Sequence, residues 1–246
     1  MSDLAAVILA AGKGTRMKSD LPKVFHEILG EPMLSYVIKT VQALKPKRTL
    51  IVVGHQRGLI TDYYKDWPVE FVVQAEQLGT GHAVQQAETA LSGFNGNVLV
   101  LAGDVPLLTV ETLQQLVAFH ECHQAAATDL TAELPDAGSY GRVLRGNGGE
   151  LLKIVEKKDA SPAELAIREF NTGTFCFDAK ALFSALKEVK AENAQKEYYL
   201  TDTIHILRQK GLPVHAYKTG DASETLGINT KEELVAIERR LLSSGK

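Results

Sequence analysis

Residues 9–17 read LAAGKGTRM and follow directly on the apolar run LAAVI at residues 4–8. This pattern predicts a buried β-strand that ends in a glycine-rich loop carrying two cations, Lys13 and Arg16. Glycines allow backbone N–H groups to turn toward an anion and to approach it closely. A lysine and an arginine supply the positive charge that suits a polyphosphate. The segment therefore predicts a phosphate-binding loop at the end of a strand.

Two well-known phosphate loops do not match this segment. A P-loop requires G-x-x-x-x-G-K-[ST], whereas Gly12 is followed by KGT. The dinucleotide fingerprint G-x-G-x-x-G finds its first two glycines at Gly12 and Gly14, but Met17 stands at the third position. A plain strand-to-helix turn would explain the first glycine and leave the cations unexplained.

Apolar runs typical of strands alternate with helical patterns along the first half of the chain. The expected strands span residues 4–10, 49–53, 69–73 and 98–102, and the expected helices span residues 32–44, 81–91 and 110–120. This order predicts a Rossmann-like α/β fold, with a mainly parallel sheet flanked by helices on both faces.

The second half has a different pattern, with a glycine-rich hairpin between strands. The expected strands span residues 141–144, 150–155, 170–177 and 214–217, and the expected helices span residues 179–189, 200–210 and 231–242. These elements predict a mixed sheet with a small inserted β lobe. Because no linker rich in Pro, Gly or Ser divides the chain, we expect residues 1–246 to form a single domain.

Composition narrows the class of protein. The chain has 246 residues, of which 45% are hydrophobic, and a net charge of −3. This charge argues against a broad nucleic-acid surface, and no apolar run approaches the roughly 18 residues of a membrane span. The first apolar run follows Asp3 rather than basic residues, unlike a signal peptide, and Cys122 and Cys176 suggest no disulfide framework. We therefore expect a cytoplasmic protein with neither nucleic acid nor membrane as a partner.

Polar segments follow four of the expected strands, and ligands of open α/β sheets bind at such strand ends. The segments are the loop at 9–17, QAEQLGTGHA at 74–83, GDVPLL at 103–108 and NTG at 171–173. Asp104 follows an apolar strand beside the phosphate loop and is a natural Mg²⁺ ligand, since Thr109 is better placed to cap the next helix. Asn229 could supply a second oxygen, although the residues alone favour a helix cap there.

Other polar positions are ambiguous from the residues alone. Lys23, which follows Pro22, is either a phosphate partner or a solvated lysine. Glu156 is either a partner of a sugar hydroxyl or a surface acid, and its neighbours favour the surface. His120 and His123 have helical spacing and no further ligands nearby, which favours a solvated helix face over a metal site.

Eight segments of the chain resemble, in order, the N-terminal pyrophosphorylase domain of the bacterial N-acetylglucosamine-1-phosphate uridyltransferases, in the sugar nucleotidylyltransferase family. They read LAAGKGTRM, LPKVF, QAEQLGTGHA, GDVPLL, YGRV, IVEKKDA, FNTGTF and GINT. The resemblance implies the nucleotide-diphospho-sugar transferase fold. It also implies an enzyme that transfers UMP from UTP to N-acetylglucosamine 1-phosphate, releases pyrophosphate and supplies peptidoglycan synthesis with UDP-N-acetylglucosamine.

The resemblance further implies a role for each matching residue. Arg16 and Lys23 would act in catalysis by holding the triphosphate, and Asp104 and Asn229 would bind Mg²⁺. The nucleotide would contact Leu9, Ala10, Ala11, Gly12, Gln74, Gly79 and Thr80. The sugar would contact Gly103, Gly141, Glu156 and Asn171.

The chain departs from the family pattern in two respects. Ala102 stands where the family often has an aromatic residue, which affects the expected specificity for sugar or nucleotide. The sequence also has no counterpart of the family's left-handed β-helix, which carries acetyl transfer and trimer formation. We expect either a stand-alone uridyltransferase or a part of a longer protein, and the oligomeric state stays open.

Three alternatives remain at this point. The chain is a nucleotidylyltransferase for another sugar 1-phosphate or another NTP, a non-catalytic nucleotide-sugar sensor, or an NAD(P)-binding module. Met17 weakens the last alternative. The complete set of Arg16, Lys23, Asp104 and Asn229 argues against a sensor, which does not need a transfer apparatus.

Overall fold

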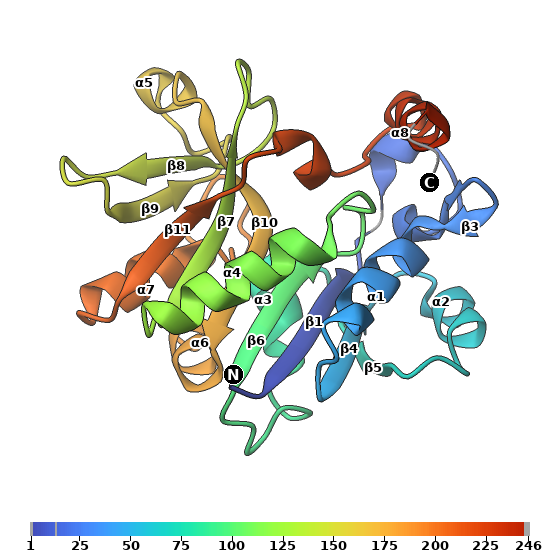
Figure 1. The fold of residues 1–246 in the computed structure, drawn as a ribbon, viewed down its shortest axis with the longest axis horizontal. Coiled ribbons are helices and arrows are strands. Elements are labelled where there is room, and N and C mark those ends of the chain that lie inside the picture. Colours follow the sequence, from blue (N-terminus) through green and yellow to red (C-terminus); the bar gives the residue numbers. More distant parts are fainter. Residues whose placement is uncertain (1, 13, 244–246) are drawn as a thin grey trace.

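The computed structural model describes residues 2–12 and 14–243, and a mixed β-sheet forms its centre (Figure 1). The strands of the main path, in the order β11-β7-β10-β6-β1-β4-β5, are β11 (Val214–Lys218), β7 (Ala127–Glu133), β10 (Glu169–Asp178), β6 (Asn97–Ala102), β1 (Leu4–Ala10), β4 (Arg48–Val53) and β5 (Glu70–Val73). The pairs β1–β4, β1–β6, β4–β5 and β7–β11 are parallel, whereas β10 runs antiparallel to β6 and β7. The predicted mixed, mainly parallel sheet is confirmed.

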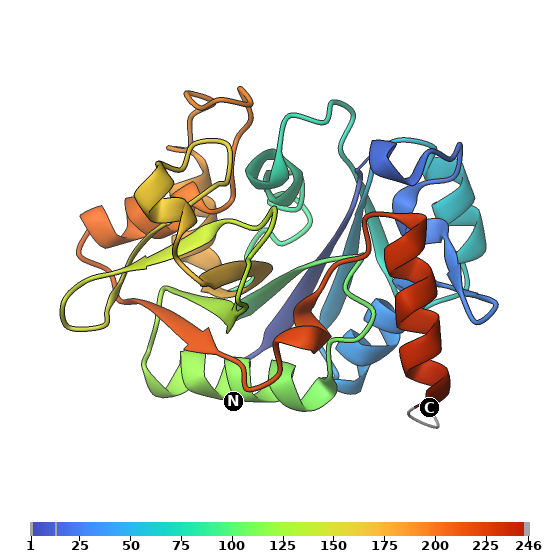
Figure 2. The same ribbon diagram turned by 90° about the horizontal axis from the view of Figure 1, so that it is seen from above.

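The central strand β1 is apolar throughout because both of its faces are buried. Successive side chains of a strand point to opposite faces, so Ala5 and Val7 join one core while Ala6 and Ile8 join the other. The first core is covered by α3 (Thr80–Gln85), α6 (Ala179–Leu186) and α7 (Asp202–Gln209), and the second by α1 (Met33–Ala43), α2 (Arg57–Tyr63) and α4 (Val110–Cys122). Figure 2 shows α3 and α4 on opposite sides of the sheet.

A small lobe lies beside β10, as the sequence predicts. Its hairpin consists of β8 (Arg142–Arg145) and β9 (Leu151–Val155), and β8 also pairs with β10. The short helix α5 (Pro162–Leu165) follows the hairpin.

In Figure 1 this lobe lies far from the last helix, α8 (Lys231–Ser243), which contacts β2 (Glu27–Ile28). The remaining short elements are β3 (Glu31–Pro32) and the 3₁₀ turns η1 (Thr15–Met17), η2 (Lys23–Phe25) and η3 (Ala222–Thr225).

Several elements differ from the sequence-based expectations. The helix expected at residues 81–91 is α3, which ends at Gln85 and continues as turns. The apolar pattern does not predict β7, because Thr128, Asp129 and Thr131 interrupt it, although all three side chains are buried. The pattern does not predict α2 either, because that helix buries Ile60 and so has no buried apolar face that recurs every three or four residues.

Lys13, one of the two cations predicted in the glycine-rich loop, lies outside the described residues. Across residues 2–12 and 14–243, no helix has the length and apolar character needed to cross a bilayer.

Candidate active site

Two adjoining cavities lie at the carboxyl ends of the parallel strands, where ligands of open α/β sheets bind. One, the β5 cavity, has a volume of about 470 Å³ and lies between the end of β1 and the loop after β5. The other, the lobe cavity, has a volume of about 230 Å³ and lies between the end of β6, β10 and the small lobe. Ala102 and Asp104 line both cavities, so the two meet at the end of β6.

The β5 cavity is lined by all seven residues that the sequence resemblance assigns to a nucleotide. They are Leu9, Ala10, Ala11, Gly12, Gln74, Gly79 and Thr80. Gln74 is buried, its amide nitrogen donates to the carbonyl oxygen of Gly79 at 3.1 Å, and the same nitrogen lies 3.1 Å from Nδ1 of His82. The Gln74 side chain therefore shapes the loop after β5 from within.

The segment that precedes α7 supports this loop from outside. The N–H of Gly81 donates to the carbonyl of Tyr198 at 2.8 Å, and the N–H of Leu200 donates to the hydroxyl of Thr80 at 3.1 Å. Gly79 has a φ of +114°, and a Cβ at this position would lie 2.6 Å from the carbonyl oxygen of Tyr198. Only glycine meets both conditions, so the approach of the two segments depends on it.

Four polar side chains from distant parts of the chain meet where the two cavities adjoin. The ammonium of Lys23 forms an ion pair with Oδ2 of Asp104 and donates to Oδ1 of Asn229 at 2.6 Å. The guanidinium of Arg16 donates to the same Asn229 oxygen at 2.8 Å. The side chains of Lys23 and Asp104 are only 15% and 18% exposed, so water screens this ion pair weakly. The structure thus brings together all four residues predicted to act in catalysis or metal binding.

The contacts around this cluster show whether Asn229 caps the last helix and whether Lys23 is solvated, two questions that the sequence alone leaves open. Thr230 caps α8, because its hydroxyl accepts from the N–H of Glu233 and the Glu233 carboxylate accepts from the N–H of Thr230. Asn229 is therefore not the helix cap that the residues alone favour, and its side-chain oxygen faces the two cations. Lys23 is not a solvated lysine either.

The lobe cavity is lined by Gly141, Glu156 and Asn171, three of the four residues expected to contact a sugar. Glu156 is not the surface acid that its neighbours in sequence favour, since its Oε1 accepts from the hydroxyl of Thr201 at 3.1 Å. Burial raises the pKa of Glu156, and the nearby carboxylate of Asp202 acts in the same direction, against the hydrogen bond from Thr201.

The backbone of β10 is irregular where Asn171 enters the lobe cavity. The pairing of β10 with β7 shifts register between Asn171 and Thr174. Oδ1 of Asn171 accepts from the N–H of Gly173 at 2.8 Å, and Gly173 has a φ of +79°. This bulge turns the NTG segment toward the cavity in the middle of a long strand.

Gly103, the fourth residue expected to contact a sugar, is not among the residues that line either cavity. Its N–H donates to the carbonyl of Leu9 at 2.9 Å. A Cβ on Gly103 would lie 3.1 Å from a methyl carbon of Leu34 and 3.2 Å from one of Val24. Gly103 thus lets the end of β6 pack closely against the core below the site, and its expected contact with a sugar stays a prediction.

Sequence reasoning did not single out three side chains of the site. Tyr140 lines the lobe cavity, and its hydroxyl accepts from the N–H of Gly227 at 2.9 Å, which joins the lobe to the segment that carries Asn229. Glu197 lines the β5 cavity, and Thr201 holds Glu156. The available signals were the YGRV motif and the segment EYYLTD at residues 197–202.

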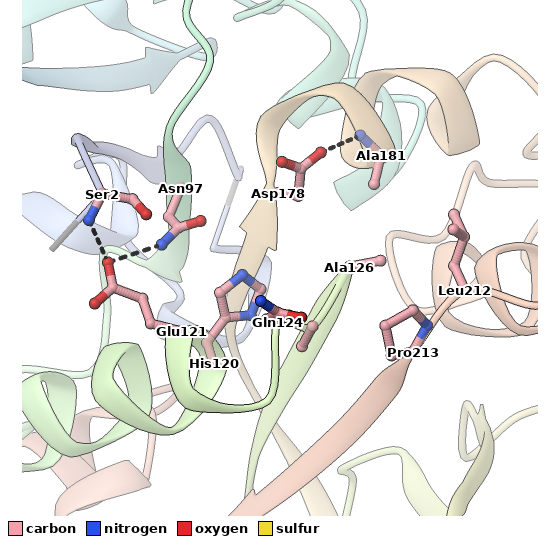
Figure 3. Close-up of a pocket in the computed structure, with 11 residues that line it drawn as sticks. Ser2, Asn97, His120, Glu121, Gln124, Ala126, Asp178, Ala181, Leu212 and Pro213 are labelled. Carbon is pink, nitrogen blue, oxygen red and sulfur yellow. Dashed lines mark hydrogen bonds between the residues drawn. The ribbon is translucent and has the colours of Figure 1, made fainter.

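A third cavity, of about 500 Å³, lies at the opposite ends of the strands (Figure 3). There, Glu121 accepts hydrogen bonds from the N–H of Ser2 and the amide of Asn97, and Asp178 accepts from the N–H of Ala181 at the start of α6. These polar groups satisfy one another, and the cavity is separate from the two described above.

His120, on the wall of this third cavity, is not on a solvated helix face as expected. Its side chain is buried, its Nδ1 lies 3.0 Å from the hydroxyl of Thr128, and burial lowers its pKa to about 4. His120 is therefore a neutral core histidine, whereas His123 is exposed and stacks on Phe119. Among the described residues, no group of three or more His, Cys, Asp or Glu side chains is arranged to hold a metal ion.

Curated relatives match nearly the whole chain. The bifunctional protein GlmU of Shouchella clausii (strain KSM-K16) is 53% identical over 238 residues, which is 97% of this chain and 52% of that protein. The bifunctional protein GlmU of Streptococcus suis (strain 98HAH33) is 51% identical over 238 residues, again 97% of this chain and 52% of that protein. The chain thus spans about half the length of the relatives it matches and is homologous to that part of them.

Solved structures share the fold at lower sequence identity. A UDP-glucose pyrophosphorylase complexed with UDP-glucose has a TM-score of 0.78 and 19% identity, and the match covers 99% of this chain and 100% of that one. A putative glucose-1-phosphate thymidylyltransferase from Bacillus anthracis, in complex with a sucrose, has a TM-score of 0.74 and 19% identity over 96% of this chain and 94% of that one. The expected nucleotide-diphospho-sugar transferase fold is confirmed.

The family model described as the MobA-like NTP transferase domain matches residues 6–199. This range contains the glycine-rich loop, the loop after β5, Asp104 and the small lobe. It thus includes both walls of the β5 cavity and most of the lobe cavity. The chain therefore belongs to the family of MobA-like NTP transferase domains.

Proposed function

We propose that this chain is a UDP-N-acetylglucosamine pyrophosphorylase, which transfers UMP from UTP to N-acetylglucosamine 1-phosphate and releases pyrophosphate. The observation that carries the proposal is that two cavities meet at Asp104, beside Lys23, Arg16 and Asn229. A transferase needs such a junction, because the two reactants must meet at the reacting phosphorus. The motifs of the uridyltransferase family and the 53% identity to a bifunctional protein GlmU support the choice of nucleotide and sugar.

In this proposal the β5 cavity takes the uridine part of UTP. The small residues Ala10, Ala11 and Gly12, which line this cavity together with Leu9, allow the nucleotide to lie against the end of β1. Gln74, Gly79 and Thr80 would face the uracil edge, on a loop that is already held from both sides. Because the loop is ordered in advance, binding the base would require little further loss of conformational freedom.

The lobe cavity would take N-acetylglucosamine 1-phosphate. Glu156 and Asn171 offer polar side chains for the sugar. Gly141 leaves space beside them, since a Cβ at this position would lie 3.5 Å from Oε1 of Glu156. Thr201 fixes the orientation of the Glu156 carboxyl group. Thr201 would therefore act as a positioning residue for the sugar rather than as a contact.

Magnesium fits the oxygens at the junction. Oδ2 of Asp104 and Oδ1 of Asn229 already face a single cation, the ammonium of Lys23. Mg²⁺ prefers one or two protein oxygens together with phosphates and water, and these two side chains would hold it in this way. When bound, the ion would neutralise charge on the triphosphate.

The residues of the chain then account for an in-line transfer. A phosphate oxygen of the sugar phosphate would attack the α-phosphorus of UTP, and pyrophosphate would leave. The attacking monoester is largely dianionic near neutral pH, because its second pKa is about 6, so no general base is required. Arg16 and Lys23 would stabilise the charge that spreads over the transferring group.

Release of pyrophosphate from UTP and N-acetylglucosamine 1-phosphate, with Mg²⁺ or with EDTA, tests the proposal. We expect metal-dependent turnover that falls on the order of 10²–10³-fold in Arg16→Ala, by analogy with the loss of one oxyanion donor. A panel of NTPs and sugar 1-phosphates serves as the control for specificity. Faster turnover of another pair would overturn the substrate assignment, and binding of UDP-N-acetylglucosamine without any turnover would favour a sensor.

The proposal also takes residues 1–246 as one nucleotidyltransferase domain that acts in the cytoplasm. The sheet that continues from β11 through β1 to β5 supports the single domain, because residues of both cavities are attached to it. Separate unfolding transitions of the two halves in calorimetry would contradict it.

A further inference from the structure

The Lys23 ammonium lies at the position that the proposed metal ion would take. Its ammonium lies between the two oxygens proposed to hold Mg²⁺, in an ion pair with Asp104 and 2.6 Å from Oδ1 of Asn229. We propose that Lys23 is an internal cation that occupies this site while nucleotide is absent, so that a divalent ion enters together with a triphosphate and not alone. This inference rests on the proposed function, because it takes Asp104 and Asn229 as the metal ligands.

The lysine ammonium and a metal ion exclude each other at this position. Mg²⁺ binds oxygen ligands at about 2.0–2.1 Å. The Lys23 nitrogen already contacts both oxygens, so an ion held by Asp104 and Asn229 would overlap with it or lie directly against it. Two positive charges at such a separation repel strongly where water is scarce. The ammonium must therefore leave before the ion is bound.

The surroundings of Lys23 restrict this movement to the end of the side chain. Its backbone belongs to η2, where Val24 is buried, and a side chain on Gly14 would collide with Cβ of Lys23. The stem is therefore held between the glycine-rich loop and the core. Lys23 also lines the β5 cavity, so its ammonium can turn from Asp104 toward a ligand in that cavity without movement of the backbone.

A triphosphate changes the balance between the two positions of the ammonium. With the metal alone, Lys23 would lose its partly buried ion pair with Asp104 and would gain no phosphate oxygen in exchange. With a triphosphate in the β5 cavity, phosphate oxygens replace Asp104 as the partner of Lys23, and the freed carboxylate accepts the metal. Metal and triphosphate therefore bind cooperatively, and by linkage each raises the affinity of the other by the same factor.

Titration of the full chain with Mn²⁺ in the absence of nucleotide, with free Mn²⁺ measured by electron paramagnetic resonance, tests this inference. Lys23→Met keeps an unbranched side chain of nearly the same length and removes its charge. We expect this variant to bind Mn²⁺ about 5–150-fold more tightly than wild type, the range typical of coupled sites. The double variant Lys23→Met with Asp104→Asn should lose the gain, because the carboxylate is then missing.

Lys39→Met is the matched control, since Lys39 pairs with Glu31 at an exposed position away from the junction. It changes net charge equally and should leave Mn²⁺ affinity unchanged. Should Lys23→Met fail to fold, as judged by its melting curve, Lys23→Gln provides the same comparison with a neutral side chain. Equal Mn²⁺ affinity of wild type and the neutral variant, or an equal gain in Lys39→Met, would overturn the inference.

The test separates this inference from the proposed function because no substrate is present. A gain of Mn²⁺ binding in Lys23→Met, without turnover of UTP by wild type, would support the inference about the cation and refute the proposed reaction. Turnover by wild type with no gain in the variant would refute the inference alone.

Discussion

The buried carboxyl group of Asp129 should make the stability of this fold depend on pH. It lies on β7 and is fully buried, and neither of its carboxyl oxygens has a hydrogen-bond partner. Burial raises the pKa of Asp129 well above its usual range. The carboxylates of Glu169 and Glu156 add to this effect, and Arg145 opposes it. The folded protein therefore holds a proton on Asp129 that the unfolded chain releases at an ordinary aspartate pKa.

The raised pKa fixes the sign of the pH dependence. Above the ordinary aspartate pKa of about 3.9, the unfolded state has lost the proton while the folded state of Asp129 keeps it. The folded state then binds one proton more, so the free energy of unfolding falls by about 1.4 kcal/mol per pH unit until the folded pKa is reached.

Asp129→Asn and Asp129→Val separate titration from polarity. Asparagine keeps the shape and removes the titration, so the difference between its free energy of unfolding and that of wild type should increase steadily from pH 5 to pH 7 in favour of asparagine. Valine also removes the polar atoms that lack partners, which should add about 1–3 kcal/mol at every pH. Urea unfolding of the three proteins at pH 5, 6 and 7 measures these differences. Parallel stability curves for wild type and Asp129→Asn would refute the reasoning.

Two predictions concern the walls of the cavities. Thr201→Val removes the hydrogen bond to Glu156. We expect the KM for N-acetylglucosamine 1-phosphate to rise about 5- to 10-fold, which corresponds to the loss of one hydrogen bond. An equal rise in the KM for UTP would contradict a role confined to the sugar. Gly79→Ala should raise the KM for UTP and lower the melting temperature, whereas Gly93→Ala, also at positive φ but with open space, should cost only about 1–2 kcal/mol of strain. Equal effects of the two alanines on the KM for UTP would exclude the steric contact as the cause.

The sequence predicts the parts of the fold that follow from local hydrophobic pattern. β1 and β6 are apolar because both faces of the sheet are covered, and this leaves an unambiguous signal. β7 has no such signal, since its polar side chains are buried by tertiary packing that local pattern does not contain. Asp129 is the extreme case, because a buried carboxyl group without partners contradicts the usual rule for strand cores.

The same limit applies to the site. Motif resemblance correctly indicates seven residues that line the β5 cavity. These residues lie in two short continuous segments, one at the end of β1 and one in the loop after β5, so each segment is recognisable as a motif. Gly103 illustrates the difficulty: packing against Leu34 and Val24 leaves little room for a side chain there, and the motif alone does not distinguish this packing from a ligand contact. The roles of Asn229 and Thr230 also depend on which of two adjacent residues caps α8, and only the helix geometry decides this.

The segment before α7 explains why residues of both cavities are ordered together. Leu200 binds the hydroxyl of Thr80 on the wall of the β5 cavity, and the next residue, Thr201, binds Glu156 on the wall of the lobe cavity. Consecutive residues of one chain segment thus support two walls that are formed by parts of the sequence more than 70 residues apart, positions 80 and 156. A displacement of this segment would alter both walls at once. The placement of two reactants on either side of Asp104 therefore depends on this connection as much as on the residues that would touch them.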